Sequence, residues 1–200
     1  MEGMKTILII ALIAMATNAM AINPPGTKKV KIGNETFYVD QNEINIADWL
    51  EYVNYTERKF GKNSDEVKTV LPQGVETKES IAKHKLTDPI TGISLAQAQE
   101  YCKWRSEVVN AVNDETGLGN VQYTIPTEEQ YSKLLKLFGS YEILSDKNKT
   151  ERIVGLRSSV NELTSEGSVL KNNGSFSKED IIPGNNIGFR CVAIVTKIKK

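Results

Sequence analysis

Few side chains in this 200-residue chain can act as nucleophiles, redox groups or soft metal ligands. The chain has two cysteines, Cys102 and Cys191, and one histidine, His84. His84 stands between Lys83 and Lys85. Because neighbouring cations disfavour metal binding, we interpret it as a solvated surface residue. One such histidine supports neither a Ser-His-Asp triad nor a histidine metal cluster, so the chemistry of the chain depends on its two thiols.

The first 21 residues are expected to form a secretory signal peptide. An apolar run over residues 6–17 is followed by Ala19-Met20-Ala21, which fits the small-x-small pattern before a cleavage point. The alternative is an uncleaved membrane anchor, but a run of about a dozen residues is shorter than the roughly 20 that span a bilayer. We therefore expect cleavage after Ala21, a linker over residues 22–27, one domain over residues 28–200, and a periplasmic or secreted protein with no membrane span after cleavage.

The interpretation of the two cysteines depends on the predicted export, because exported proteins enter an oxidising compartment. In an oxidising compartment, two cysteines with no others most often form one structural disulfide, so we expect a bond between Cys102 and Cys191. They lie 89 positions apart. Closing a loop of that order stabilises the folded state by about 4–5 kcal/mol in the chain-entropy model.

The charge balance argues against a polyanion as partner. Lys and Arg together number 25, as do Asp and Glu, so the net charge is zero. Nucleic-acid-binding proteins usually carry a basic excess or a strongly basic face, and we expect no nucleic-acid partner here. A hydrophobic content of 40% with 25% charged residues is typical of a folded globular domain.

Local patterns in the first half of the domain predict a hairpin and then a helix. Apolar and polar residues alternate on both sides of Gly33-Asn34, which indicates two short strands joined at that pair. Asn45 is a good N-cap for a helix whose apolar residues share one face: Ile46, Trp49, Leu50 and Val53. Residues 61–89 show poor periodicity, and we expect a long irregular excursion there.

The second half opens on two capping boxes. Ser94-x-x-Gln97 starts a helix with one predicted inward face: Ala98, Tyr101, Cys102, Arg105, Val108, Val109 and Val112. Residues 121–125 alternate as a strand, and Thr127-x-x-Gln130 then starts a helix that we expect to end at Gly139. Residues 140–186 are interpreted as loops with short strands, and residues 187–195 as a buried strand, apolar on both faces.

Five segments, in order, resemble the formylglycine-generating enzyme, or sulfatase-modifying factor, family. Residues 37–49 (FYVDQNEINIADW) are similar to the family's opening strand and its EVTNxxY helix start, and residues 89–104 (PITGISLAQAQEYCKW) to PVxxVSWxxAxxYCxW. Residues 123–131 (YTIPTEEQY) resemble YRLPTEAEW, residues 158–163 (SSVNEL) a degraded GNVWEW, and residues 186–191 (NIGFRC) the GFR ending.

The resemblance implies an α+β fold of the C-type-lectin-like type. Such a domain has small antiparallel sheets, two or three helices, long irregular loops and, here, one disulfide. In that fold the N-terminal and C-terminal strands pair. The family also often joins the YCxW helix to the GFRC strand by a disulfide, which again selects Cys102 and Cys191.

The same resemblance bears on catalysis. Catalytic members bind copper through two further cysteines near a Gly-Gly-Ser segment and activate oxygen there. The corresponding residues 169–177 (VLKNNGSFS) contain no thiol, and hydroxyl, amide and amine groups do not supply soft copper ligands. We therefore expect a non-catalytic binding or assembly module of a bacterial cell envelope. The alternative is a copper-dependent formylglycine-generating-type oxidase acting on sulfatase cysteines.

Calcium is the cofactor that the resemblance implies. The family's ligands fall on the Glu162 carboxylate and on the carbonyls of Ser158 and Val160, and such oxygen ligands suit the ion. The alternative is that Glu162 forms an ion pair with a nearby base, either Arg190 or Arg157. Arg190 lies in the predicted terminal strand, where a buried guanidinium needs a carboxylate partner.

Binding is expected in the irregular stretches, because loops on a rigid scaffold are where recognition usually lies. We favour residues 140–186, which the resemblance places on the family's substrate-cleft side, over residues 61–89. The residues expected to contact an envelope protein or glycan are polar: Asn161, Asn172, Asn173 and Ser175. The alternative is a solvated loop without a partner, since Asn, Ser and Gly also mark ordinary turns.

Overall fold

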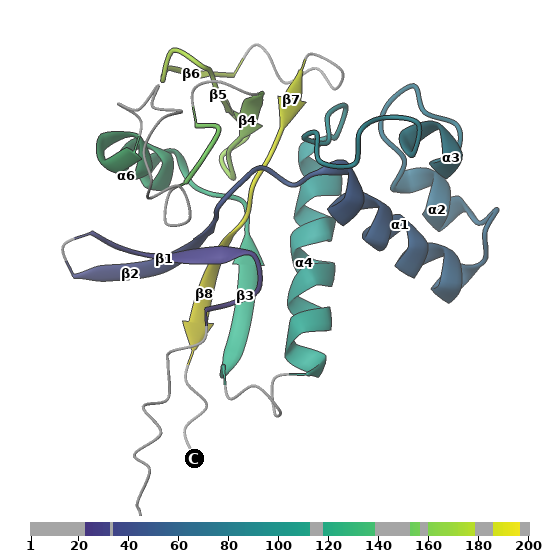
Figure 1. Ribbon diagram of the computed structural model, residues 1–200, viewed down its shortest axis with the longest axis horizontal. Helices are drawn as coiled ribbons and strands as arrows, with labels where there is room; N and C mark the ends of the chain where they lie inside the picture. The colour runs from purple at the N-terminus through teal and green to yellow at the C-terminus, as the bar shows by residue number, and fades with distance from the viewer. Residues whose placement is uncertain are drawn as a thin grey trace, which may run out of the picture.

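Two small sheets and five helices make up the described part of the computed structural model, which is an α+β protein (Figure 1). The described residues are 23–32, 34–112, 118–138, 153–156, 160–178 and 186–196. The predicted signal peptide, its cleavage site and Ser158 lie outside them. No helix in these ranges is both long and apolar enough to span a bilayer.

The first sheet joins the two ends of the domain. It is antiparallel, with the order β1 (Thr27–Ile32), β2 (Glu35–Asp40), β8 (Val192–Thr196), β3 (Asn120–Thr124). The register pairs Ile32 with Glu35, which confirms the hairpin predicted around Gly33-Asn34. The pairing of β2 with β8 also agrees with the expected contact between the N-terminal and C-terminal strands. β1 begins at Thr27, inside the predicted linker.

The second sheet is built from short strands within the predicted loop region. Its order is β6 (Phe176–Ser177), β5 (Val169–Leu170), β4 (Asn161–Leu163), β7 (Ile187–Gly188). The first two contacts are antiparallel, and β7 runs parallel to β4.

The three longer helices begin where the capping patterns predict, and two short helices were not predicted. The five helices are α1 (Ile46–Phe60), α2 (Asp65–Thr69), α3 (Lys78–Ile81), α4 (Leu95–Ala111) and α6 (Glu128–Phe138). Asn45 and Ser94 each complete a reciprocal capping box. Thr127 does the same, because its hydroxyl accepts from the Gln130 amide and its own amide donates to the Gln130 side chain. The three longer helices were therefore set by local sequence.

Residues 61–89 are more ordered than predicted, since they contain α2 and α3. Ser64 and Thr77 cap these helices, whose single buried anchors are Val67 and Ile81. Helices of four or five residues are too short to show an apolar period, which is why the pattern pointed to an irregular segment.

At the C-terminal end of α4, the predicted inner face is confirmed for Val109, which is buried, and wrong for Val108 and Val112. Val108 and Val112 are 43% and 52% exposed. The residues that face strand β3 there are polar instead: the Asn110 side chain bonds both the amide and the carbonyl of Val121, at 2.8 Å each, and the Ser106 hydroxyl accepts from the Tyr123 amide at 2.8 Å. Helix α4 thus lies along the edge of β3, and its side chains form hydrogen bonds with the backbone groups of that strand.

The predicted terminal strand is interrupted. Residues 189–191 separate β7 from β8, because the chain crosses there from the second sheet to the first. Ile194, expected to be buried, is 49% exposed on β8. The apolar pattern of residues 187–195 therefore did not show that this segment contributes one strand to each of the two sheets.

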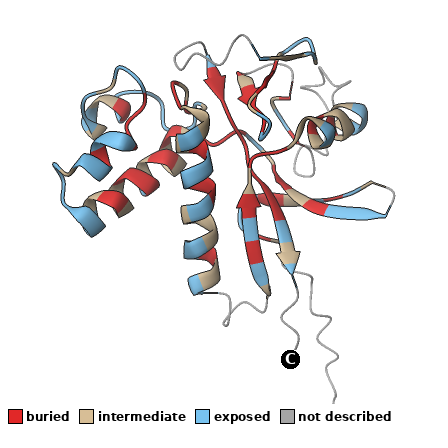
Figure 2. Ribbon diagram, turned by 180° about the vertical axis from the view of Figure 1, so that it is seen from behind, coloured by how far each residue is buried: buried red, intermediate tan, exposed pale blue. Residues whose placement is uncertain are grey.

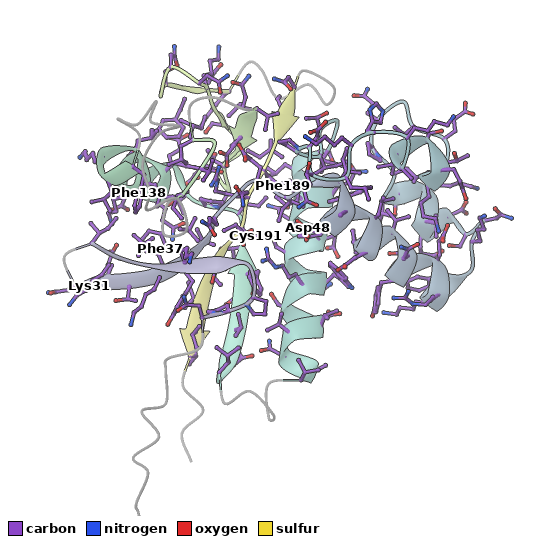
Figure 3. All side chains as sticks on the ribbon, viewed as in Figure 1. Lys31, Phe37, Asp48, Phe138, Phe189 and Cys191 are labelled. Atoms are coloured by element: carbon purple, nitrogen blue, oxygen red, sulfur yellow. The ribbon has the colours of Figure 1, made fainter. Side chains whose placement is uncertain are left out.

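Two apolar clusters fill the interior. Figure 2 shows the buried residues in red. In the larger one, Trp49 stacks on Tyr101 with ring centroids 5.4 Å apart, and the edges of Tyr52 and Phe189 meet the Trp49 ring. The smaller one lies between α6 and the β1–β2 hairpin, where Phe37 and Phe138 are seen (Figure 3). Both tryptophans belong to the larger cluster, Trp104 as a partly buried member, as their apolar neighbours indicate.

The buried tyrosines predict a loss of stability at alkaline pH. Burial raises the pKa of Tyr52 from 10.0 to about 12, with Glu100 and Glu107 adding to the effect. Below pH 10 the phenol is protonated in both states. Above pH 10 it ionises only in the unfolded state, so the free energy of unfolding should fall as pH rises from 10 towards 12. Denaturant titrations across this range should show a smaller fall for Tyr52→Phe. An equally steep fall in that variant would contradict the assignment.

Candidate functional site

The turn between β5 and β6 carries three of the four predicted binding residues. Asn172, Asn173 and Ser175 are all exposed. The Asn173 side-chain oxygen accepts from both the amide and the hydroxyl of Ser175, at 2.9 and 2.7 Å. Lys171 donates its amide to the Ser175 carbonyl and accepts from the Gly174 amide, each at 2.8 Å, and Gly174 has a φ of +85°. The turn is therefore shaped by its own side chains.

The fourth predicted residue, Asn161, lies at the same end of the second sheet. The register pairs Glu162 with Leu170, so Asn161 at the start of β4 is next to Lys171 in the neighbouring strand. Asn161 is half-buried, and its amide donates to the Asn186 carbonyl at 3.1 Å. The structure thus brings the four residues to one end of a sheet, with Asn161 set deeper than the turn.

A buried ion pair lies beneath this end of the sheet. The Arg190 Nε and Nη2 groups donate to the two Glu162 carboxylate oxygens, both at 2.6 Å, and Arg190 and Glu162 are 0% and 1% exposed. Tyr131 of α6 donates its hydroxyl to Glu162 Oε2 at 2.8 Å. Burial lowers the pKa of the Arg190 guanidinium, but the Glu162 carboxylate outweighs burial and raises the pKa above its usual value. Arg190 is therefore charged and needs Glu162.

A second carboxylate, Glu43, approaches the same guanidinium. Its Oε1 lies 3.6 Å from Arg190 Nη2, and the side chain is 6% exposed. Gly155 makes room for it, because a Cβ at that position would overlap the Glu43 carboxylate. Gly155 also has a φ of +84°, which disfavours other residues. Glu43 was not predicted as a partner of Arg190, because the two residues are far apart in the sequence.

The described residues do not fit a calcium ion at Glu162. Both carboxylate oxygens already bond a cation, the Arg190 guanidinium, so a second cation there would meet like charge. Within the described ranges, no three His, Cys, Asp or Glu side chains gather as a metal-binding group. The geometry instead agrees with the alternative in which Glu162 pairs with Arg190; Val160 is a buried residue preceding β4.

The two cysteines meet in the core. Cys102 of α4 and Cys191 before β8 have sulfur atoms 3.3 Å apart, and both are free and buried. A disulfide has sulfurs about 2.05 Å apart, so the bond predicted from the sequence is not present in this structure. What the structure confirms is the proximity of the only two thiols in the chain.

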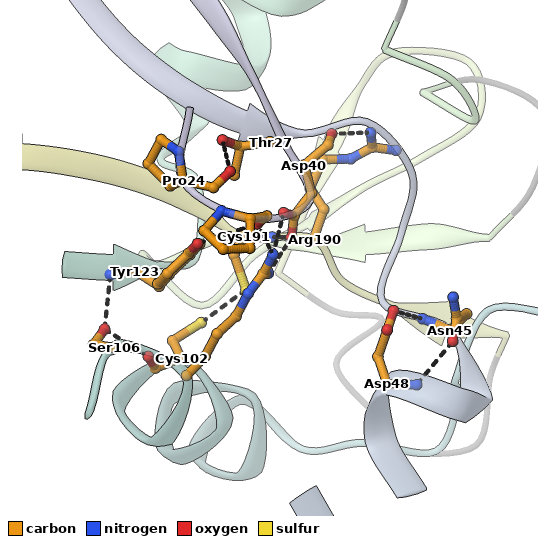
Figure 4. Close-up of polar contacts among 12 residues, drawn as sticks. Pro24, Thr27, Asp40, Asn45, Asp48, Cys102, Ser106, Tyr123, Arg190 and Cys191 are labelled. Atoms are coloured by element: carbon orange, nitrogen blue, oxygen red, sulfur yellow. Dashed lines mark hydrogen bonds and ion pairs between the residues drawn. The ribbon is translucent and has the colours of Figure 1, made fainter. Parts of the chain in front are cut away.

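Asp40 holds the backbone around Cys191 (Figure 4), and Arg105 in turn holds Asp40. Asp40 Oδ2 accepts from the Cys191 amide at 2.8 Å, and the Asp40 amide donates to the Cys191 carbonyl at 2.9 Å. Arg105 donates to both Asp40 oxygens, at 2.7 and 2.9 Å, and lies over the Tyr123 ring. The inward position of Arg105 was predicted from its helix face; its pairing with Asp40 was not, because the two are far apart in sequence.

Removing one partner of the Arg190–Glu162 pair should strongly destabilise the fold. Glu162→Gln leaves a buried guanidinium without its main counter-charge, which typically costs about 3–5 kcal/mol. Urea unfolding should show this loss for Glu162→Gln and for Arg190→Met, and a loss in the double variant smaller than the sum. Lys62→Ala removes a pair that is 66% and 59% exposed and serves as the control. Strictly additive losses would show that the two side chains do not stabilise each other.

Comparison with known families gives one match. The profile described as "Sulfatase-modifying factor enzyme 1-like domain" matches residues 12–137, which is more than half of the chain. Comparisons with curated proteins and with solved structures give no match. The matched range includes α1, α4 and all of α6 except Phe138, and it covers three of the five segments that carry the resemblance; residues 158–163 and 186–191 lie beyond it. The chain therefore belongs to the sulfatase-modifying factor enzyme 1-like family.

Proposed function

We propose that this protein is a non-catalytic binding or assembly module, exported to a bacterial cell envelope, that presents loops on a C-type-lectin-like scaffold. The observation that carries the proposal is the position of its thiols. The resemblance places residues 169–177 at the segment near which the family's catalytic cysteines lie, and these residues contain no thiol. Both cysteines of the chain lie instead in the core, against each other.

The β5–β6 turn has the properties of a recognition surface. Its backbone is fixed by the bonds between Asn173 and Ser175 and by the left-handed Gly174, so little conformational entropy is lost when a partner binds. Exposed amide groups on such a turn can both donate and accept hydrogen bonds. This chemistry suits a polar partner surface, either an envelope protein or a glycan, and we place the contact on Asn172, Asn173, Ser175 and the adjoining Asn161.

The competing function is a copper-dependent oxidase of the formylglycine-generating type. One observation favours this function: the sulfur atoms of the two thiols lie 3.3 Å apart, and thiolates are soft ligands that select Cu(I). In that case Cys102 and Cys191 would hold the metal, and the protein would be reduced when isolated in active form. Stoichiometric copper binding by the reduced protein, together with oxygen-dependent oxidation of a cysteine peptide, would favour the oxidase over the binding module.

Substitution of the turn should weaken partner capture. The tagged mature protein is used to capture partners from an envelope extract of its own source, and the captured species are identified by mass spectrometry. The variant Asn172→Ala/Asn173→Ala/Ser175→Ala should retain at most a tenth of the wild-type capture, because it removes the polar side chains. Its melting transition should stay in place, because all three side chains are exposed and the bonds lost between Asn173 and Ser175 lie within the turn itself.

A matched control lies in the competing loop region. Lys62→Ala/Glu79→Ala removes an exposed pair between the end of α1 and α3 and should leave capture unchanged. Loss of capture in this control, with normal capture by the triple variant, would move the binding site to residues 61–89.

The exported protein should carry a Cys102–Cys191 disulfide. The thiols are already adjacent, and an oxidising compartment favours the bond. After unfolding without reductant, a thiol reagent should count no free cysteine. Cys102→Ser should lower the melting temperature, because it removes a cross-link worth about 4–5 kcal/mol in the chain-entropy model. Two free thiols in the unfolded, non-reduced protein would contradict this prediction.

A further inference from the structure

A groove runs between helix α4 and strand β3. Its volume is about 610 Å³, its lining surface is mainly apolar, and the residues that border it include Lys103, Glu107, Gln122, Tyr123 and Ile125. The groove exists because α4 lies beside the edge of β3, joined to it by Ser106 and Asn110. We call it the α4–β3 groove. Cys102 also lines it, whereas Cys191 does not.

The two thiols therefore differ in how a reagent can reach them. Both residues are buried, but Cys102 borders the groove, whereas Cys191 does not. Asp40 further restrains Cys191, because it bonds both the amide and the carbonyl of that residue. An outward movement of Cys191 would break both bonds and the adjoining β2–β8 pairing.

We propose that Cys102 is the reactive thiol of the pair, and that small uncharged disulfides reach it through the α4–β3 groove. The surface that lines the groove is mainly apolar, and Lys103 and Glu107 add one charge of each sign. Such a lining suits small reagents without a net charge. The proposal concerns the reduced protein and is independent of the partner-binding function.

The reaction is a two-step thiol–disulfide exchange. In the first step the Cys102 thiolate attacks a disulfide RSSR, the Cys102–SR bond forms, the RS–SR bond breaks, and the leaving RS⁻ takes up the proton lost by Cys102. In the second step the Cys191 thiolate attacks the Cys102 sulfur, the Cys102–Cys191 bond forms, and a second RS⁻ leaves with the proton from Cys191. Both cysteines are oxidised, and RSSR is reduced to two RSH.

The environment of Cys191 makes the second step the slower one. Burial raises the pKa of the Cys191 thiol, and its hydrogen bond with Cys102 and the nearby Asp40 carboxylate add to this effect. The other charged group facing it, Arg105, acts in the opposite direction but is paired with Asp40. Little Cys191 thiolate is present near neutral pH, so the mixed disulfide on Cys102 should accumulate and then decay faster as the pH is raised.

The test follows the two thiols separately in the folded, full-length, reduced chain. Hydroxyethyl disulfide, which is small and uncharged, serves as the probe, and samples are quenched in acid for intact-mass and peptide analysis. Cys191→Ser should accept one adduct on Cys102. Cys102→Ser should react at Cys191 at least tenfold more slowly until it is unfolded. Equal rates in the two variants, or adduct formation on Cys191 first, would overturn the proposal.

A second pair of variants tests the route. Gln122→Trp places a large ring in the groove and should slow the reaction of Cys102 at least fivefold. Thr36→Trp, at an exposed position of β2 outside the groove, is the control and should leave the rate unchanged. Equal rates in both variants, or rates that rise steeply with low concentrations of urea, would show that the thiol reacts through unfolding and not through the groove.

Discussion

The fold depends on a positive charge buried where the chain passes from one sheet to the other. Arg190 stands between β7 and β8, and its guanidinium is fully enclosed. Its N–H groups donate hydrogen bonds to the Glu162 carboxylate of β4, to the carbonyl of Asp40 at the end of β2, and to the carbonyl of Val154. One side chain thus connects three segments that are far apart in sequence. Because an unpaired buried charge is so costly, these segments have to be assembled together.

The same crossing explains the role of Asp40. At residues 189–191 the backbone has left the strand pairing of the second sheet and has not yet joined that of the first. Its buried amide and carbonyl groups therefore need other hydrogen-bond partners. Ile44 donates to the Phe189 carbonyl, and the Asp40 side chain accepts from the Cys191 amide. Arg105 then balances the charge of Asp40 from α4. A second buried ion pair therefore follows from the geometry of the crossing, and it fixes the helix that carries Cys102 against the strand that follows Cys191.

Features that depend on residues close together in the sequence could be predicted, whereas features that depend on contacts between distant residues could not. Asn45, Ser94 and Thr127 act on amides three residues away, so their helices could be located from local pattern. The interruption between β7 and β8 at residues 189–191, in contrast, depends on which strands pair with each of them. The same holds for Glu162: its sequence context fitted calcium or a base equally, and only the position of Arg190 in space distinguishes them. Family membership agrees with the local motifs, while the chemistry depends on these distant contacts.

The contact between α4 and β3 has a consequence for solubility. A strand at the edge of a sheet can recruit a strand from another molecule, which is a common route to aggregation. Asn110 and Ser106 close this route at β3, because they occupy the backbone groups that a new strand would need. At the opposite edge, β1 pairs only with β2 among the described strands, and it carries exposed Lys29 and Lys31. Two copies meeting edge to edge there would bring like charges together, so the sheet resists self-association on both sides by different means.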